Sequence, residues 1–205
     1  MPSLRLPSRF VVALLLALCP RAFATTVIAP DFDSLVGQAD FVVRAVVKTV
    51  HSEWRDNPAN PGERYIATRV ELDVKEAVKG TPPSPLVLQM VGGRVGDDEL
   101  VVEGAPRFKP GEESILFIRG NGRVFSPVVA LMHGAYPVRR DARTGRAEVL
   151  RSDGRPLYRA RDVEMPLGAR SPMLTANPDA RPLTTAEFSA RIRQSVEHAA
   201  REKQH

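Results

Sequence analysis

The side chains of this 205-residue chain that are best suited to catalysis or metal binding are its four histidines. No two of them have the short spacing with which a helix or hairpin presents ligands to a metal ion, so the sequence does not predict a zinc site. His133 stands out because the neighbouring Gly134 allows another stretch of backbone to approach closely. A lone loop histidine is more often structural than functional, and both interpretations stay open here. The four are His51, His133, His198 and His205.

A glycine-rich segment, residues 92–96, follows a predicted strand and is the next candidate for ligand binding. It lacks the fingerprint of a nucleotide-binding loop, and the carboxylates of Asp97, Asp98 and Glu99 directly after it would repel a phosphate. These carboxylates also lack the alternate spacing and the central glycine of a calcium loop, which favours a solvated turn. Arg94 is the side chain of this segment that we take as a candidate partner contact.

The motifs do not combine into a catalytic site. The chain contains no Gly-x-Ser-x-Gly elbow around a nucleophilic serine. An exported hydrolase stays open as an alternative, and it requires His133 to converge with Asp97 or Asp98 in one cleft. We therefore predict no catalytic residue, no cofactor and no metal ion.

Trp54 is the only tryptophan of the chain, and it lies in a polar segment, residues 51–58. We predict that this segment is the loop between two long strands. A large aromatic side chain in a loop can anchor a protein partner. The alternative is that the ring folds back over one end of the protein's own barrel.

The first 24 residues have the three-part order of a cleaved secretory signal peptide. Arginines occur without acidic residues in residues 1–9, an unbroken apolar run covers residues 10–18, and Ala22 and Ala24 form a small-x-small cleavage site. The apolar run is about half of the roughly 20 residues that a membrane span needs. We therefore expect cleavage after Ala24, export to the periplasm or beyond, and no stable membrane span after cleavage.

Cys19 is the single cysteine, and it falls inside this predicted signal peptide. Leu18 before it and Pro20 after it make acylation of a lipoprotein type unfavourable. The mature chain would then contain no cysteine, which excludes a disulfide, a thiolate zinc site and a cysteine nucleophile. The fold must be stabilised by its hydrophobic core.

The formal net charge of +5 overstates how basic the mature protein is. Three arginines leave with residues 1–24, and the charge of the mature chain falls to +2. The remaining arginines are scattered, without the clustered basic and aromatic residues of a nucleic-acid interface. We expect no nucleic-acid partner.

The apolar pattern predicts a mainly β protein with a helix at each end. Residues 31–39 have helical spacing behind the possible cap Asp31, and residues 65–78 show the clearest strand alternation. Many short strands with turns between them favour a small OB-like Greek-key barrel of five to six strands within a domain of residues 25–150. The other predicted strands are 25–28, 41–50, 86–91, 100–103, 114–119, 124–129 and 147–150.

The pattern dissolves over residues 151–182, which we predict to be an irregular linker. A C-terminal amphipathic helix follows over residues 183–205. Thr184 and Glu187 have capping-box spacing, and Phe188, Ile192 and Val196 form a narrow apolar stripe. The stripe either docks on the protein's own barrel or binds a partner.

Residues 39–47, Ala-Asp followed by an apolar strand with an arginine, and residues 74–80, which end in Lys-Gly, together resemble the netrin-like domains typified by the tissue inhibitors of metalloproteinases. The resemblance spans about residues 39–80 and implies an OB-type barrel. Residues 104–112 and 115–118 also resemble a segment of uncharacterised exported bacterial proteins.

The chain departs from the inhibitor family at the N-terminus. In that family a cysteine at the mature N-terminus chelates the zinc of the protease, whereas the predicted first residue here is Thr25. The cysteine mechanism therefore cannot be transferred, although Thr25 has an α-amino group and a hydroxyl that could meet a metal. A secreted metalloprotease inhibitor or modulator stays open as an alternative.

The expected function is that of an exported, non-enzymatic binding module. Its loops would engage a protein or another ligand of the envelope or extracellular space, as loops on OB-type barrels do. Four residues are the candidate partner contacts: Thr25, Trp54, Arg94 and His133.

Overall fold

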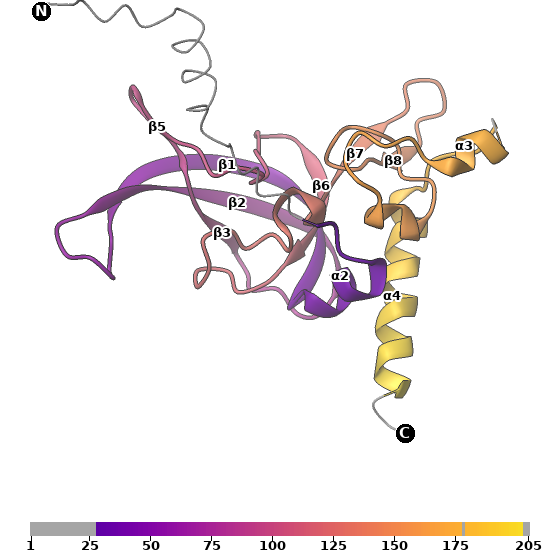
Figure 1. Ribbon diagram of the computed structural model, residues 1–205, viewed down its shortest axis with the longest axis horizontal. Coiled ribbons are helices and arrows are strands. Elements are labelled where there is room, and N and C mark those ends of the chain that lie inside the picture. The colour runs from indigo at the N-terminus through magenta and orange to yellow at the C-terminus, as the bar shows by residue number, and fades with distance from the viewer. Residues whose placement is uncertain (1–27, 178, 203–205) are drawn as a thin grey trace, which may run out of the picture.

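The computed structural model describes residues 28–177 and 179–202 and has a mainly β architecture (Figure 1). A six-stranded antiparallel sheet has the order β3-β2-β1-β6-β7-β8, and β4 and β5 form a separate two-stranded sheet. The strands are β1 (Phe41–Asp56), β2 (Arg64–Lys79), β3 (Leu86–Val91), β4 (Gly93–Val95), β5 (Asp98–Leu100), β6 (Glu113–Ile118), β7 (Ala135–Arg140) and β8 (Ala147–Val149). The helices are α2 (Phe32–Gln38), α3 (Pro172–Ala176) and α4 (Thr185–Glu202), with 3-10 turns η1 (Leu131–Gly134) and η2 (Ala160–Glu164).

The predicted signal peptide, its cleavage site at Ala22 and Ala24, the candidate contact Thr25 and His205 lie outside the described residues. Within the part of the chain that is described, no helix combines the length and the apolar character needed to cross a membrane.

The longest strands are β1 and β2, which have 16 residues each and pair to form the curved ribbon on the left of Figure 1. The predicted alternation of β2 is confirmed, because Val70 and Leu72 are buried while Arg69 is exposed. In β1 the register shifts between Val47 and Thr49, so the strand continues to Asp56 after an irregularity at Lys48. Val47 and Val50 consequently lie on the same face of the sheet.

The prediction that Trp54 lies in the connecting loop is therefore wrong. Trp54 is a residue of β1 and pairs with Ile66 of β2, and the connection between the strands is limited to residues 57–63. The polar residues of 51–58 have the composition of a loop, but pairing with β2 satisfies the backbone groups of residues 51–56 and extends the strand to Asp56.

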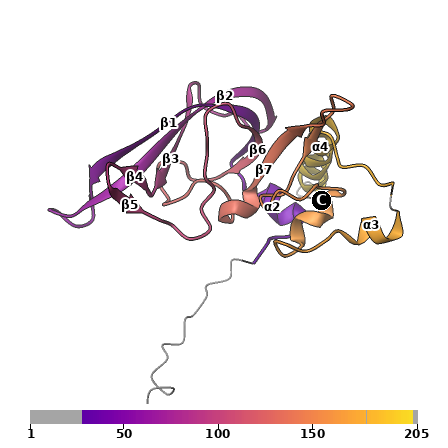
Figure 2. The ribbon, with the colours of Figure 1, turned by 90° about the horizontal axis from the view of Figure 1, so that it is seen from above.

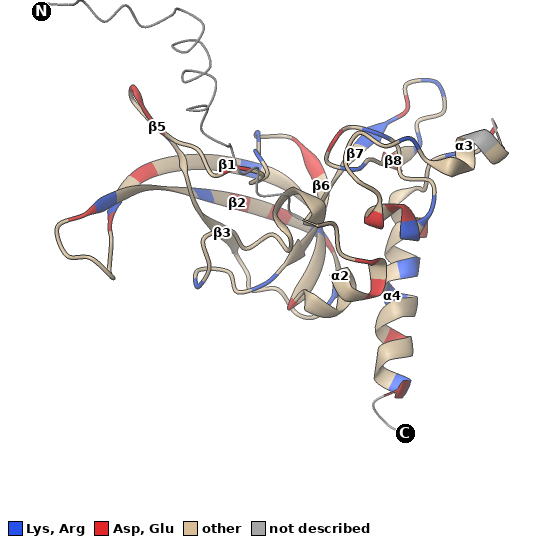
Figure 3. Ribbon diagram, in the orientation of Figure 1, with Lys and Arg blue, Asp and Glu red and all other residues tan. Residues whose placement is uncertain are grey.

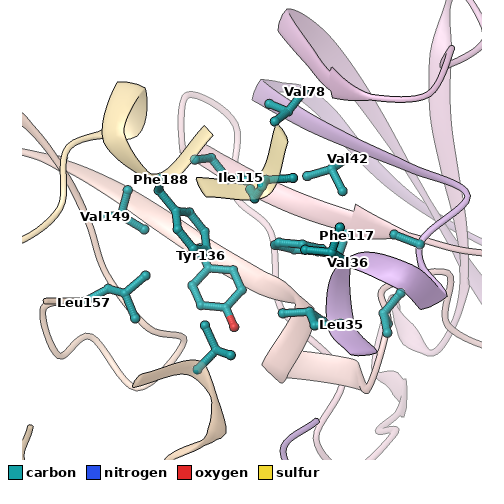
Figure 4. Close-up of a cluster of buried hydrophobic side chains, with 14 residues drawn as sticks. Leu35, Val36, Val42, Val78, Ile115, Phe117, Tyr136, Val149, Leu157 and Phe188 are labelled. Carbon is teal, nitrogen blue, oxygen red and sulfur yellow. The ribbon is translucent and has the colours of Figure 1, made fainter. Parts of the chain in front are cut away.

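One hydrophobic cluster lies between the sheet and the helices (Figure 4). At its centre, the ring of Phe188 from α4 lies 5.2 Å from that of Tyr136 and 6.2 Å from that of Phe117. Burial raises the pKa of Tyr136 far above its usual range. Phe188 and Ile192 are fully buried, so the apolar stripe of the C-terminal helix docks on the protein's own core.

The helix ends are fixed as the sequence predicts. The Asp31 carboxylate accepts a hydrogen bond from the Ser34 backbone N–H at 2.8 Å and caps α2. At α4, the Thr184 N–H donates to the Glu187 carboxylate at 2.7 Å, and the Glu187 N–H donates to the Thr184 hydroxyl at 3.2 Å. These reciprocal bonds are those of a capping box.

A second hydrophobic cluster lies on the opposite face, between β1, β2, β3 and β6, and includes Val43, Val70, Leu88 and Leu116. The predicted strand at 124–129 is not a strand, because its only ladder contact is an isolated bridge between Val128 and Ile118 of β6.

The segment at 119–129 nevertheless connects β6 to β3. The Val91 N–H of β3 donates to the Phe125 carbonyl at 2.7 Å. The Asn121 side chain accepts from the Gln89 N–H at 3.0 Å and donates to the Val87 carbonyl at 2.8 Å. Side-chain bonds from Asn121 thus replace part of a regular ladder.

Among the described residues of 151–182, only η2 and α3 are regular elements, yet this segment contributes to the core. Leu157 and Val163 belong to the cluster that surrounds Phe188. The buried Arg151 guanidinium donates to the carbonyls of Met165 and Pro166, at 2.5 and 2.8 Å, and ties the segment together.

Candidate functional site

A cleft of about 330 Å³ opens between the sheet and the chain that follows β3. Its floor comes from β1, β2 and β3, and its wall comes from the β4–β5 hairpin and the loop at residues 101–108. Figure 2 shows this hairpin beside the β1–β2 ribbon, at the end of the molecule remote from α4. The floor is lined by Val50, Ser52, Thr68, Val70, Met90 and Val91, and the wall by Gly92, Gly93, Arg94, Glu99, Leu100, Val101, Val102, Ala105, Pro106, Arg107 and Phe108.

Two glycines allow the wall to fold against the floor. A Cβ atom on Gly92, where φ is +102°, would lie 2.9 Å from the Leu100 carbonyl oxygen. A Cβ atom on Gly93, where φ is +133°, would lie 2.2 Å from the Thr68 hydroxyl and 2.4 Å from that of Ser52. Both positions need glycine for conformation and for space. The glycine-rich segment therefore contains strand β4 and forms part of the cleft wall.

The 101–108 loop is held in place at both of its faces. The Met132 N–H of η1 donates to the Gly104 carbonyl at 3.0 Å. On the other side, Ala105 and Phe108 pack against the second hydrophobic cluster. The cleft therefore has a fixed wall, although this loop has no regular structure.

The floor carries a pair of hydroxyl groups within otherwise apolar surroundings. Ser52 and Thr68 are register partners on β1 and β2, and their side-chain oxygens lie 2.8 Å apart. The Thr68 hydroxyl donates to the Gly92 carbonyl at 2.6 Å. This polar chain links the floor of the cleft to the first residue of its wall.

Two arginines line the cleft. The Arg94 guanidinium donates to the Glu99 carboxylate at 2.6 Å across the hairpin, so its charge is compensated. Within the described part of the chain, no carboxylate pairs with the exposed guanidinium of Arg107. Figure 3 shows acidic residues at the tip of the hairpin and residues of both signs along the β1–β2 ribbon.

Apolar side chains are exposed at the rim of the cleft. Leu100 and Val101 retain 37% and 57% of their surface, and Phe125 retains 54%. The Phe125 carbonyl accepts a hydrogen bond from the N–H of Val91, the last residue of β3. Gly92, which follows Val91 in the chain, lies against the Leu100 carbonyl. Exposed apolar residues therefore flank the same end of β3 on both sides.

The sequence candidates are distributed unevenly around this cleft. Arg94 lines it, whereas Asp97 and Asp98 are exposed at the tip of the hairpin. Trp54 lies two residues beyond Ser52, on the same face of β1, but outside the lining. The Arg64 guanidinium lies 5.6 Å from the Trp54 ring centre, which is a cation–π contact.

His133 is buried in η1, next to β6 and β7, and does not belong to the cleft lining. A Cβ atom on the adjacent Gly134 would lie 2.3 Å from the Val129 carbonyl oxygen, so the backbone does approach closely there. Across residues 28–177 and 179–202, no three His, Cys, Asp or Glu side chains gather as ligands for a metal ion.

Sequence reasoning missed Ser52, Thr68 and Arg107 as members of one site. The signal for Ser52 and Thr68 was a polar pair at inward positions of two long alternating strands, which pairing places opposite each other. Nothing in the local pattern around Arg107 indicates that its loop folds over β1 and β2.

A second hollow of about 600 Å³ lies between α2, η2 and α4 and is more open to solvent. Several of its polar groups already have partners. Arg159 donates to Asp162 at 2.9 Å, Ser195 donates to Asp33 at 2.5 Å, and His198 lies 3.5 Å from Glu202. We regard the first cleft as the candidate site, because its apolar floor and fixed wall suit a ligand better.

Among the described residues, the two hydroxyls of the cleft floor contact no base that could activate them for acyl transfer. The Ser52 hydroxyl contacts another hydroxyl rather than a base, and the adjacent His51 points to the opposite face of β1. Comparison of the chain with models of protein families and with curated proteins found no match.

Proposed function

We propose that this chain is an exported, non-enzymatic binding module whose cleft between β1–β3 and residues 92–108 holds the apolar part of a ligand. The observation that carries this proposal is the combination of an apolar floor at Val50, Val70 and Met90 with a wall fixed over it. Sites for small ligands are typically concave and apolar, with a few placed polar groups. The ligand is either a small molecule or the end of a protein chain, and it comes from the envelope or extracellular space.

The scaffold of this module is, in our proposal, an OB-type barrel. Support comes from the ladders that join β1 to β2 and β6 and β2 to β3, together with the hydrogen bonds from residues 119–129 to both β6 and β3. The resulting order, β1-β2-β3-(119–129)-β6-β1, returns to its start. Amide hydrogen exchange tests whether the barrel is closed. We expect the Val91 N–H to exchange as slowly as the other hydrogen-bonded amides of β3, and fast exchange at Val91 would contradict closure.

Binding to the cleft can be tested with anilinonaphthalene sulfonate, whose fluorescence rises in apolar surroundings. Ala105→Phe places a ring in the wall of the cleft, so we expect it to weaken dye binding about tenfold or more, which corresponds to about 1.4 kcal/mol. Ala59→Phe, at an exposed position in the β1–β2 connection, is the matched control and should bind as the wild type does.

Circular dichroism and the unfolding midpoint establish that both variants fold. Equal dye binding by the wild type and Ala105→Phe, with both folded, would place the dye elsewhere and contradict the proposed site.

Export is tested by the intact mass of the protein recovered from the envelope fraction and the medium of cells that express the full chain. We expect the mass of a chain that begins at Thr25. Recovery only from the cytoplasm, with residues 1–24 retained, would reject export.

A further inference from the structure

The cleft contains a hydrogen-bond acceptor that its own residues leave available. Thr68 has one hydroxyl proton, and it is donated to the Gly92 carbonyl at 2.6 Å. The proton between Thr68 and Ser52, whose oxygens are 2.8 Å apart, must therefore come from Ser52. The Ser52 oxygen keeps lone pairs that can accept a further bond, so the floor favours a ligand with an N–H or O–H donor.

The same cleft contains a cation without a protein counter-ion. Arg94 and Glu99 compensate each other at 2.6 Å, while no carboxylate among the described residues meets Arg107. An anion that approaches Arg107 can form charge-assisted hydrogen bonds without first breaking an ion pair. A cationic ligand would instead meet Arg107 as a like charge.

Apolar surface makes up most of the rest of the site. Val50, Val70 and Met90 lie in the floor, Phe108 lies in the wall, and the exposed Leu100 extends the apolar surface at the rim. An apolar group of the ligand gains from leaving water in proportion to the area it buries there.

We propose that the cleft recognises an amphipathic anion that combines an apolar group, an amide N–H and a carboxylate, with Arg107 bound to the carboxylate and Ser52 accepting from the N–H. This inference rests on the proposed binding function and names its ligand class. Two sources share this chemistry: a small N-acyl amino acid, and the C-terminal end of a protein with an apolar side chain.

The test measures three related probes by isothermal titration calorimetry on the exported protein. N-octanoylglycine has all three features, N-octanoylglycinamide lacks the carboxylate, and N-octanoylsarcosine lacks the N–H. We expect N-octanoylglycine to bind about tenfold or more tighter than the glycinamide and about threefold or more tighter than the sarcosine compound, given the usual strengths of charge-assisted and neutral hydrogen bonds.

Two variants assign these preferences to their residues. Arg107→Gln should reduce the preference for the carboxylate to about twofold or less, and Ser52→Ala should remove the preference for the N–H. Arg140→Gln, at an exposed arginine of β7 outside the cleft, is the matched control and should keep both preferences. A carboxylate preference that survives in Arg107→Gln overturns the inference, as does the absence of any preference in the wild type.

The outcomes separate this inference from the proposed function. If Ala105→Phe abolishes binding of all three probes while Arg107→Gln changes nothing, the cleft binds ligands and the ligand class is wrong. If Ala105→Phe has no effect on the binding of any probe, the probes do not bind in the cleft and the proposed function is wrong. An N-acetylated tripeptide that ends in leucine distinguishes the two sources: tighter binding of the peptide identifies a protein C-terminus, and tighter binding of N-octanoylglycine identifies a small amphiphile.

Discussion

Gly93 brings the wall of the cleft so close to its floor that a Cβ atom at this position would overlap the hydroxyls of Ser52 and Thr68. Gly93→Ala would add a Cβ atom 2.2 Å from Thr68 Oγ1 at a φ of +133°, so we expect it to lower the free energy of unfolding by about 2 kcal/mol or more. Urea unfolding measures this loss.

The matched control is Gly96→Ala in the same hairpin. Gly96 has a φ of +62°, with open space around the position of a Cβ atom, so its replacement should cost only about 1 kcal/mol of backbone strain. Equal losses for the two variants would show that Gly93 makes no critical contact with the hydroxyl pair.

The sequence predicts the role of a single residue only where that role depends on its neighbours along the chain. Asp31 at the start of α2 follows from local spacing, and its hydrogen bonds to Ser34 lower its pKa. Trp54 was assigned to the wrong kind of element, because a polar strand that extends beyond the core has the composition of a loop. Arg107 acquires its role from a fold-back between distant segments, which local pattern cannot show.

At the scale of elements, the capping box of α4 gives a direct test. Thr184→Ala removes the hydroxyl that accepts from the Glu187 N–H, and we expect it to lower the free energy of unfolding by about 1 kcal/mol. Thr184→Ser keeps the hydroxyl and should retain most of the stability. Loss of the same size in both variants, measured by thermal unfolding, would contradict a capping role.

Glu76 of β2 joins α4 to the sheet, because its carboxylate accepts from Arg193 of α4 and from Arg44 of β1. Partial burial acts to raise the pKa of Glu76, but the hydrogen bonds from Arg193 and Arg44 outweigh it, and its pKa lies below the ordinary 4.5. A lowered carboxylate pKa stabilises the fold at pH values above the ordinary pKa, and this stabilisation is lost as the pH falls through the lowered pKa.

We therefore expect Glu76→Gln to lower the free energy of unfolding by about 1–2 kcal/mol at neutral pH and by much less near pH 3. Urea unfolding across this pH range measures the difference. Glu103→Gln, at an exposed position outside the regular strands, is the control and should show no such trend. A Glu76→Gln cost that stays constant with pH would contradict the ion-pair account.

Elements with their own periodicity were predictable, and elements that depend on neighbours were not. The alternation of β2 and the stripe of α4 gave both elements correctly. Residues 124–129 have the composition of a strand, but Asn121 and a single bridge at Val128 take the place of a regular ladder. The β4–β5 hairpin turns at Gly96 and Asp97, and its second strand ends at Leu100, where the predicted strand 100–103 was expected to begin.

For the whole molecule, the sequence indicates a β-rich protein with helices at its ends, and it leaves the arrangement of the sheet open. Apolar patterns identify which residues are buried, but not that two clusters form on opposite faces of β1 and β6. Figure 1 shows the consequence: α4 covers one end of the sheet, and the ribbon with its hairpin occupies the other. The cleft exists only because of this long-range arrangement.

Mapping a bound ligand by NMR on the isotopically labelled protein tests the central claim most directly. On addition of N-octanoylglycine we expect the largest amide shifts at Ser52, at Gly92–Val95 and in residues 101–108, with α4 and the 141–146 turn unchanged. Shifts centred on α2, η2 and α4 would place the ligand in the second hollow, and saturating ligand without any shift at Ser52 or Gly93 would contradict the binding cleft.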